Sequence, residues 1–217
     1  MNFELLVETI SNTHGHFQHQ AAKAVNVSLT LRNWLIGFYI VEFELNGEDR
    51  STYGERLFEE LAKRLKSING VDRRALYRFK DFYLLYPQIS SYIVDNHKTL
   101  SITDLYSYQI VGAANPQIEE LQKVGLATPQ SQEKTQVPVD KLISSLSYTH
   151  FEQLLQIKDV LKRTFYEIAC IKGTWSVKEL KRQINSLYFE RSGLSTKPEI
   201  LRKLLSKKQK KPRPLKL

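Results

Sequence analysis

The sequence predicts an all-α fold, a multi-helix domain that contains a helix-turn-helix-like unit. Apolar residues recur at intervals of three and four over most of the chain, as they do in amphipathic helices. Two later segments open with a hydroxyl residue followed three positions on by Glu, a pattern typical of helix starts. Only residues 92–109, which are rich in Ser, Thr and β-branched side chains, are compatible with two structures. They could form short helices or a small hairpin.

Size and composition indicate a globular protein. A chain of 217 residues, of which 41% are hydrophobic, can bury a sizeable core in one or two domains. The single cysteine, Cys170, excludes a disulfide framework within one chain. Glu4 and Glu8 interrupt the apolar N-terminal residues, so no secretory signal is expected. The strongest apolar run, 34–45, contains two glutamates and is too short to cross a bilayer. We therefore expect a cytoplasmic protein without membrane contact.

The N-terminal part is predicted to hold a short helix over 2–10 and a long one over 17–45. The polar stretch 11–15 should separate them, and Asn46-Gly47 should end the second. A third helix over 53–66 follows.

A helix-turn-helix-like unit spans residues 53–86. Ser67-Ile68-Asn69-Gly70 should break the first helix, because Asn and Gly tolerate the positive φ of a sharp turn. Asp72 is the expected N-cap of a second helix over 73–86, which must end before Pro87.

The second helix of this unit has two chemically different faces. An apolar stripe should pack inward, and it consists of Ala75, Leu76, Phe79, Phe82 and Tyr83. The other side carries the residues that a DNA groove would meet, while basic residues at the end of the first helix would touch the DNA backbone. The candidate DNA-binding residues are Arg73, Arg74, Tyr77, Arg78 and Lys80 on the second helix and Lys63, Arg64 and Lys66 before the turn.

Basic charge is concentrated in two places. Residues 63–80 carry a balance of +6, and Arg202 to Leu217 adds eight basic residues and no acid, so the rest of this +9 chain is net acidic. Concentrated positive charge is the expected footprint of a nucleic-acid-binding protein. A solvated helix face without a ligand is the simpler alternative.

The second half begins with an irregular segment. Residues 113–140 contain three prolines and many Gln and Thr residues, which indicates a linker or insert with a helical turn at 117–124. Beyond it, Thr149 to Glu152 should start a helix that runs to about Ile171, and Ser176 to Glu179 should start another that ends at Gly193. The expected division is therefore 1–112, the segment 113–140, a helical pair over 141–193, and a disordered basic tail over 194–217.

Several separated motifs resemble the N-terminal domain of the YhcG-type nucleases of bacteria. They are Val25-Asn26, Arg32 to Gly37, Tyr53-Gly54, Leu76, Phe82-Tyr83, Tyr86-Pro87, Leu146 to Phe151, Phe165-Tyr166, Trp175 to Leu180 and Tyr188 to Arg191. The resemblance covers about residues 17–194. It implies a helical DNA-binding module encoded near restriction-modification or mobile-element genes, normally followed by a PD-(D/E)XK nuclease domain. One departure is Val71-Asp72, where the family tends to have a small hydroxyl residue.

We expect no catalytic site in this chain. A PD-(D/E)XK site needs carboxylates and a Lys on adjacent strands to hold Mg²⁺ and activate water. The tripeptide Glu179-Leu180-Lys181 matches the (D/E)XK part of this motif, but it lies in the first turn of a predicted helix. The chain ends in a basic stretch where the family continues into its nuclease domain, so we expect that domain to be lost, split off or removed.

Other residues suggest weaker sites. His14, His16 and His19 lack a nearby carboxylate or Cys to complete a metal site, so no metal or cofactor is expected. The tryptophans at 34 and 175 lie within apolar periods, with Phe38, Tyr39 and Phe43 near the first, and should pack in the core. The expected partner is double-stranded DNA. The alternative is an assembly module that forms a homodimer or docks a nuclease or methyltransferase subunit.

Overall fold

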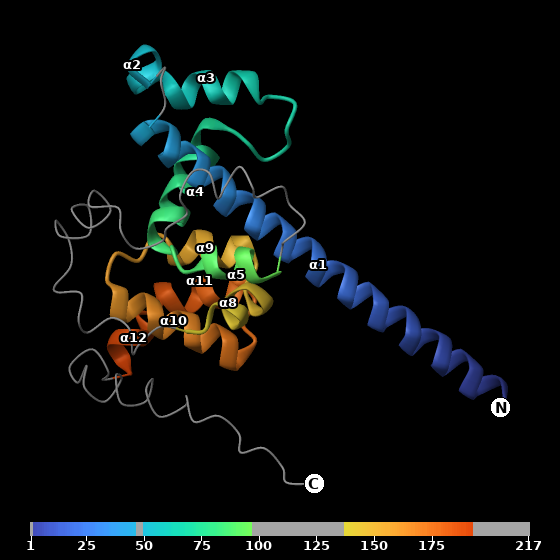
Figure 1. The fold of residues 1–217 in the computed structure, drawn as a ribbon. Coiled ribbons are helices and arrows are strands. Elements are labelled where there is room, and N and C mark those ends of the chain that lie inside the picture. The colour runs from blue at the N-terminus through green and yellow to red at the C-terminus, as the bar shows by residue number, and fades with distance from the viewer. Residues whose placement is uncertain (1, 47–49, 97–136, 193–217) are drawn as a thin grey trace, which may run out of the picture. The chain divides into compact units, whose positions relative to one another are not determined.

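The protein is helical throughout the part that the structure describes. The structure, a computed structural model, describes residues 2–46, 50–96 and 137–192, and no strand occurs in these three ranges (Figure 1). The all-α prediction is thus confirmed. The chain forms two compact units, unit 1 over Met1–Tyr86 and unit 2 over Pro87–Leu217.

Unit 1 begins with one long helix, α1, over Phe3–Asn46. The predicted break at residues 11–15 is wrong, and the helix runs through it without interruption. Thr9 and Thr13 donate their hydroxyls to carbonyls one turn earlier, at 2.7 and 2.8 Å, so these polar side chains are satisfied within the helix. Gly15 costs about 1 kcal/mol relative to Ala, which a long helix tolerates.

The two halves of α1 differ in burial. All residues from 2 to 26 are exposed, whereas most from Thr30 to Val41 are buried. By length and composition, the span Phe3–Leu45 could also cross a membrane, but 44% of its most apolar window is buried and core helices meet the same criterion. The helix is longer than the apolar run 34–45, and the absence of membrane contact stays a prediction.

The core of unit 1 lies where α1 packs on α4 (Arg73–Leu85). Trp34 is 1% exposed and donates its indole N–H to the Tyr86 carbonyl at 2.9 Å. Its ring meets Tyr83 edge-on at 5.1 Å. A Cβ on Gly37 would lie 2.0 Å from the Phe79 carbonyl oxygen, so this Gly permits the close approach of the two backbones. The predicted core roles of Trp34 and Phe38 are confirmed, but Tyr39 is 53% exposed.

The predicted helix 53–66 is divided into shorter pieces. The pieces are α2 (Arg50–Tyr53), the 3-10 helix η1 (Gly54–Arg56) and α3 (Leu57–Arg64). Gly54 has φ +41°, a conformation that regular helix excludes, which explains the division.

The turn and the second helix follow the prediction closely. Gly70 has φ +79°. Asp72 caps α4 by accepting the Ala75 N–H at 2.7 Å, and α4 ends at Leu85, two residues before Pro87.

The described part of unit 2 is built from short helices. They are α5 (Ile89–Asn96), α8 (Val139–Ser145), α9 (Tyr148–Leu154), α10 (Val160–Gly173), α11 (Val177–Asn185) and α12 (Tyr188–Arg191). Their core includes Tyr166, whose hydroxyl donates to the Gln183 carbonyl at 3.2 Å and accepts the Phe189 N–H at 3.3 Å. For residues 92–109 the sequence is compatible with helix or hairpin. Residues 92–96 belong to α5 and are therefore helical, and the rest of 92–109 lies outside the described residues.

The predicted helix from Thr149 to Ile171 is two helices. Ser147, not Thr149, is the N-cap of α9. The chain leaves helical conformation after Leu155, and Asp159 starts α10 by accepting the Lys162 N–H at 2.7 Å. A second local cap thus competes successfully with helix continuation.

The last predicted helix is also interrupted. Ser176 caps α11 as expected, accepting the Glu179 N–H at 3.2 Å. The helix ends at Asn185 and not at Gly193, because Leu187 takes a left-handed conformation with φ 55° before α12 begins. Most of the predicted insert over 113–140, including its turn at 117–124, lies outside the described residues, as does the basic tail over 194–217. The end of the predicted insert is described, and α8 begins within it at Val139.

Candidate nucleic-acid interface

The unit formed by α3, the turn and α4 is held together by aromatic packing. Leu57 and Phe58 of α3 are buried, and the Tyr77 ring stacks on Phe58 with 3.9 Å between centroids and 11° between planes. This contact fixes the two helices against each other and orients the turn between them. The basic residues on either side of the turn therefore have a defined scaffold.

Five of the predicted residues lie together around the turn with exposed side chains. They are Lys63, Arg64, Lys66, Arg73 and Arg74, hereafter the turn cations. The last two belong to the first turn of α4, which contains no acidic residue and where the helix dipole is positive. One of the five is already oriented, since Arg64 reaches the Tyr53 hydroxyl at 3.4 Å and lies 5.8 Å above its ring.

The other three predicted residues are placed differently. Lys80 is half-buried and its ammonium pairs with Glu44 of α1 at 2.5 Å, so it lies at the α1 side and not on the outward face. Tyr77 is 42% exposed but presents one ring face to Phe58. Arg78, one helical turn after Arg74 on α4, is half-buried. The structure thus gathers the turn cations and separates them from Lys80.

An acidic residue on the outward face was not considered in the sequence analysis. Asp81 follows Tyr77 by one turn, and its side chain is exposed. Neighbouring protein atoms partly desolvate its carboxyl and raise its pKa, while the Lys80 ammonium acts in the opposite direction. The positive surface is therefore limited to the turn and the first half of α4. Helical spacing from Arg74 to Asp81 would have revealed this carboxylate.

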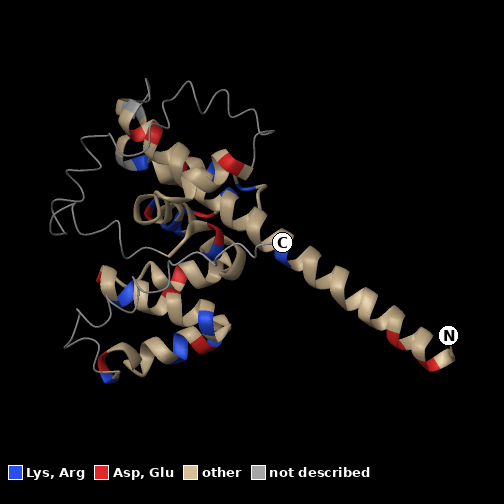
Figure 2. Cartoon of the chain, turned by 60° about the horizontal axis from the view of Figure 1, so that its bottom comes forward, with Lys and Arg blue, Asp and Glu red and all other residues tan. Residues whose placement is uncertain are grey.

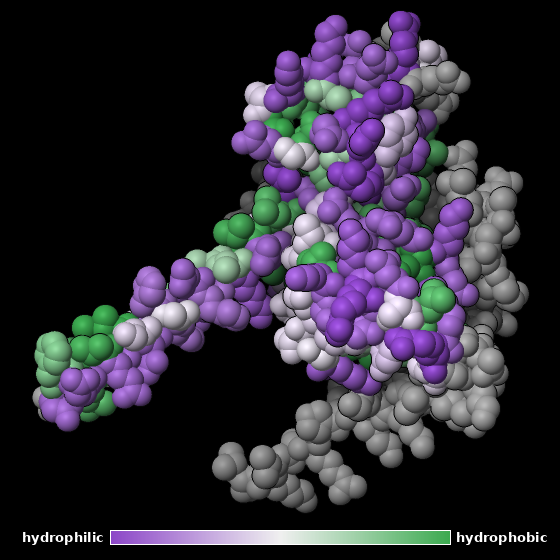
Figure 3. Space-filling model, turned by 180° about the vertical axis from the view of Figure 1, so that it is seen from behind, coloured by the Kyte–Doolittle hydropathy of each residue, from purple (hydrophilic) through white to green (hydrophobic). Residues whose placement is uncertain are grey.

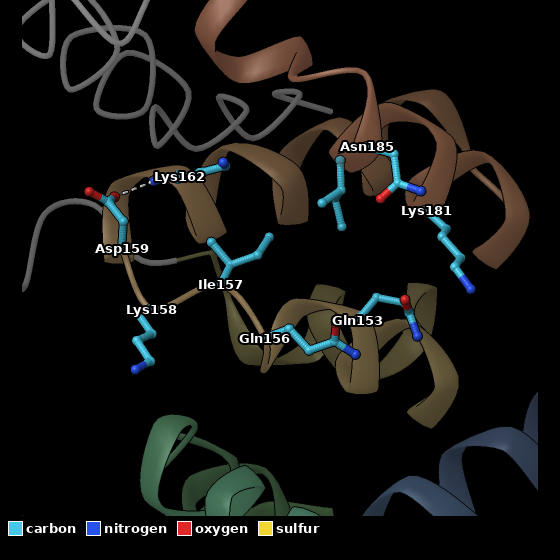
Figure 4. A pocket seen from close by; sticks show the side chains of 9 residues that line it. Gln153, Gln156, Ile157, Lys158, Asp159, Lys162, Lys181 and Asn185 are labelled. Carbon is cyan, nitrogen blue, oxygen red and sulfur yellow. Dashed lines mark hydrogen bonds between the residues drawn. The ribbon is translucent and has the colours of Figure 1, made fainter.

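Unit 2 has a polar pocket of about 460 Å³ that the sequence analysis did not single out (Figure 4). Lys158, Lys162 and Lys181 line it together with Asp159, and Figure 4 shows them on α10, α11 and the segment before α10. Lys162 is engaged by Glu190 at 2.6 Å, and Asp159 caps α10. The pocket is positive, but two of its charged groups already have structural roles.

The groups that could perform catalysis have structural roles as well. Glu179, Leu180 and Lys181 lie on α11, where Glu179 accepts hydrogen bonds from Arg182 and Gln183 at 2.8 and 2.7 Å and Leu180 is fully buried. The Arg182 guanidinium is the main cause of the lowered pKa of Glu179. Burial raises the pKa of the Cys170 thiol to about 12, which suppresses its nucleophilic form.

No group of three potential metal ligands gathers within the described ranges. His14, His16 and His19 lie on the exposed half of α1, and a His16 ring nitrogen is 2.8 Å from the Gln20 amide.

Comparisons with known proteins confirm the family resemblance seen in the sequence. The DUF1016 N-terminal domain matches residues 9–102 and 114–191. The protein described as "Putative nuclease YhcG" of Escherichia coli strain K12 is 29% identical over 182 residues, which cover 81% of this chain and 43% of that relative. The chain thus spans less than half the length of this curated relative. No solved structure matches the chain. The domain match covers most of the sequence, and the chain therefore belongs to the DUF1016 N-terminal domain family.

Proposed function

We propose that this chain is a DNA-binding targeting module of a PD-(D/E)XK nuclease family linked to restriction-modification or mobile elements. It binds double-stranded DNA through α3, the turn and the start of α4, and it has no nuclease site of its own. The observation that carries the proposal is the cluster of exposed turn cations on a scaffold fixed by the Phe58–Tyr77 stack. The relative named as a nuclease belongs to an enzyme class that acts on nucleic acid, which is consistent with this partner.

The placement of the cations divides the proposed DNA contacts between the groove and the phosphate backbone. Arg73 and Arg74 are at the amino end of α4, the end that enters the groove in helix-turn-helix proteins. Lys63, Arg64 and Lys66 lie on the other side of the turn, within reach of a neighbouring backbone strand. Asp72 and Asp81 bound this surface and oppose phosphate nearby.

The proposal makes a quantitative prediction about salt. If all five turn cations contact phosphates, the logarithm of the binding constant should fall against the logarithm of salt concentration with a slope of about −4.5. Fluorescence anisotropy of a labelled mixed-sequence duplex measures this slope. Replacing Arg73→Gln and Arg74→Gln together should weaken binding and bring the slope to about −2.7.

A matched control separates a local site from overall charge. Lys172→Gln with Lys178→Gln removes the same charge from exposed positions of unit 2 and should leave affinity and slope nearly unchanged. Equal weakening by both pairs, or binding that does not respond to salt, contradicts the proposed surface. The second result favours the assembly module, whose apolar contacts respond little to salt.

A further inference from the structure

We propose that the exposed half of α1 pairs with the same segment of a second copy of this chain, as an antiparallel two-stranded coiled coil. This inference is independent of DNA binding, because it concerns a different part of unit 1. It starts from an unusual feature, a run of exposed helix from residue 3 to residue 26 that extends from the packed part of unit 1 (Figure 1).

The exposed half of α1 carries the apolar seam of a coiled coil. In a heptad repeat with positions a to g, the d positions from Phe3 to Phe38 are apolar, and an apolar or small residue, or a His, occupies each a position from Val7 to Leu35. The d positions are Phe3, Ile10, Phe17, Ala24, Leu31 and Phe38, and the a positions are Val7, His14, Ala21, Ser28 and Leu35.

The seam is continuous with the packed interface between α1 and α4. Leu31 and Phe38 are 5% and 3% exposed, and the Phe38 ring contacts Tyr83 of α4 at 5.6 Å. Earlier along the same seam, Ile10 and Phe17 are 60% and 63% exposed. The seam is thus buried near its carboxyl end, where α1 packs on α4, and exposed at its amino end. Figure 3 shows apolar colour in separate patches along this exposed part of α1, with polar colour between them.

The distribution of side-chain size selects an antiparallel pair. The large seam residues lie near the N-terminus and the small ones lie 11 to 25 positions later. Antiparallel pairing places a large residue against a small one in the outer layers and a ring against a ring at the centre, whereas parallel pairing would stack Phe3 on its copy and leave gaps at Ala21 and Ala24. The layers are Phe3 with the partner's Ser28, Val7 with the partner's Ala24, Ile10 with the partner's Ala21, and His14 with the partner's Phe17.

The charged residues of this segment also favour an antiparallel pair with a second copy of the chain. Between residues 2 and 26 the only charged side chains are Glu4, Glu8 and Lys23, and Figure 2 shows this half of α1 largely without charge colour. An antiparallel pair brings the acidic end of each helix to the basic end of the other. A parallel pair would superimpose the glutamates, which repel.

The exposed apolar side chains of this segment supply a substantial part of the surface that a stable dimer buries. Phe3 and Phe17 are 73% and 63% exposed, and at about 200 Å² per ring they contribute roughly 270 Å² of the ~800 Å² that each partner buries in a typical interface. Leu6, Val7, Ile10 and Val25 are also partly or largely exposed. These residues extend along about 33 Å of helix, and such a helix gains most of its stability from packing.

The first test is the mass of the intact chain in solution. Sedimentation equilibrium of nucleic-acid-free protein at high salt should give twice the chain mass of 25.3 kDa. Ile10→Glu places a charge in the seam and should halve the mass, while Asn12→Glu adds the same charge on the outer face and should leave the dimer intact. A monomeric parent chain, or an Ile10→Glu variant that stays dimeric, overturns the proposal. High salt removes DNA contacts, so failure here is distinct from failure of the proposed DNA surface.

Cross-linking tests the orientation. With Cys170→Ser as the background, an Ile10→Cys chain mixed with an Ala21→Cys chain should form a disulfide-linked dimer on oxidation, and neither alone should do so. In one helix these positions are about 16 Å apart, so the link can only join two chains. Cross-linking of the Ile10→Cys chain with itself indicates a parallel pair and overturns the register. Flotation of a monomeric parent chain with liposomes would instead assign the seam to a membrane.

Discussion

At the scale of single residues, His150 shows how burial gives a side chain a defined protonation state. The ring is 9% exposed and bridges two parts of unit 2. Nδ1 accepts the Ser147 backbone N–H at 3.2 Å, and Nε2 lies 2.9 Å from the Trp175 carbonyl oxygen. A carbonyl only accepts, so Nε2 carries the proton and the ring is neutral. In this capping box His150 has the place that Glu or Gln usually takes.

The first prediction is that His150 makes stability depend on pH. Burial lowers its pKa from the usual 6.5, although the Trp175 hydrogen bond acts in the other direction. As pH falls below 6.5, the unfolded state binds more protons than the folded state, so the free energy of unfolding should decrease. Urea denaturation over about pH 5 to 8 measures this decrease. His150→Gln should flatten the curve, whereas His19→Gln, at an exposed position of α1, should not. If the unfolding free energy of His150→Gln depended on pH as that of the parent chain does, the role assigned to His150 would be contradicted.

Residues with local roles were predictable, and residues with distant partners were not. Gly70 and Asp72 act on chain neighbours, so the sequence pattern was enough to predict the turn and the cap. Lys80 has its partner 36 positions away in Glu44, and helical period alone cannot reveal such a pair. His150 was missed as a capping residue because its imidazole replaces the expected carboxylate.

At the scale of elements, the packing of α1 on α4 depends on one position without a side chain. The second prediction concerns Gly37→Ala, whose Cβ would lie 2.0 Å from the oxygen and 2.6 Å from the carbon of the Phe79 carbonyl. Both atoms belong to the backbone, so the helices must separate, and we expect a loss of about 1–3 kcal/mol or more in unfolding free energy. Chemical denaturation followed by Trp fluorescence measures it, because Trp34 lies in this interface.

Gly15→Ala is the matched control for this prediction. Gly15 is also within α1, but a Cβ there meets no heavy atom within 4 Å. The same change should therefore stabilise the helix by about 0.5–1 kcal/mol. A stable Gly37→Ala variant would mean that the two helices do not pack as closely as described.

The third prediction separates the two effects of Asp72 on α4. Its carboxylate caps the helix through the Ala75 N–H, and its charge lies beside Arg73 and Arg74. Asp72→Asn keeps a capping oxygen and removes the charge, so we expect unchanged stability and tighter DNA binding in the anisotropy assay. Asp72→Ala removes both and should cost about 1 kcal/mol of stability. Weaker DNA binding by a stable Asp72→Asn variant would contradict the proposed orientation of α4.

Helix existence was easier to predict than helix boundaries. Apolar period identified α1, α4, α10 and α11, because each buries one face. The boundaries depended on competing local effects. Gly15 did not break α1, whereas Asp159 starts a new helix, α10, where periodicity alone would continue the preceding one, and the left-handed Leu187 separates α11 from α12. The free-energy differences between these outcomes are about 1 kcal/mol, which pattern reading does not resolve.

At the scale of the whole molecule, the sequence predicts where the positive charge is concentrated but not how the chain divides into units. The basic segment 63–80 is evident in the sequence, and five of its cations are exposed around the turn. The sequence alone does not divide the chain as the structure does at Tyr86, since contacts between distant segments define the two units. The exposed half of α1 was missed for the same reason, because an apolar helix gives one periodic signal whether its seam is covered or open.

The last prediction is that the purified chain does not cleave DNA. The tripeptide Glu179-Leu180-Lys181 lies on α11, where successive side chains turn by about 100°, so the carboxylate and the ammonium point to different sides. Glu179 is bonded to Arg182, which opposes metal binding. Supercoiled plasmid incubated with the chain and Mg²⁺ or Mn²⁺ should therefore stay intact on a gel. Glu179→Gln is the control, since cleavage that this change abolishes would establish a metal-dependent site on α11 and refute the proposal of a targeting module without catalytic activity.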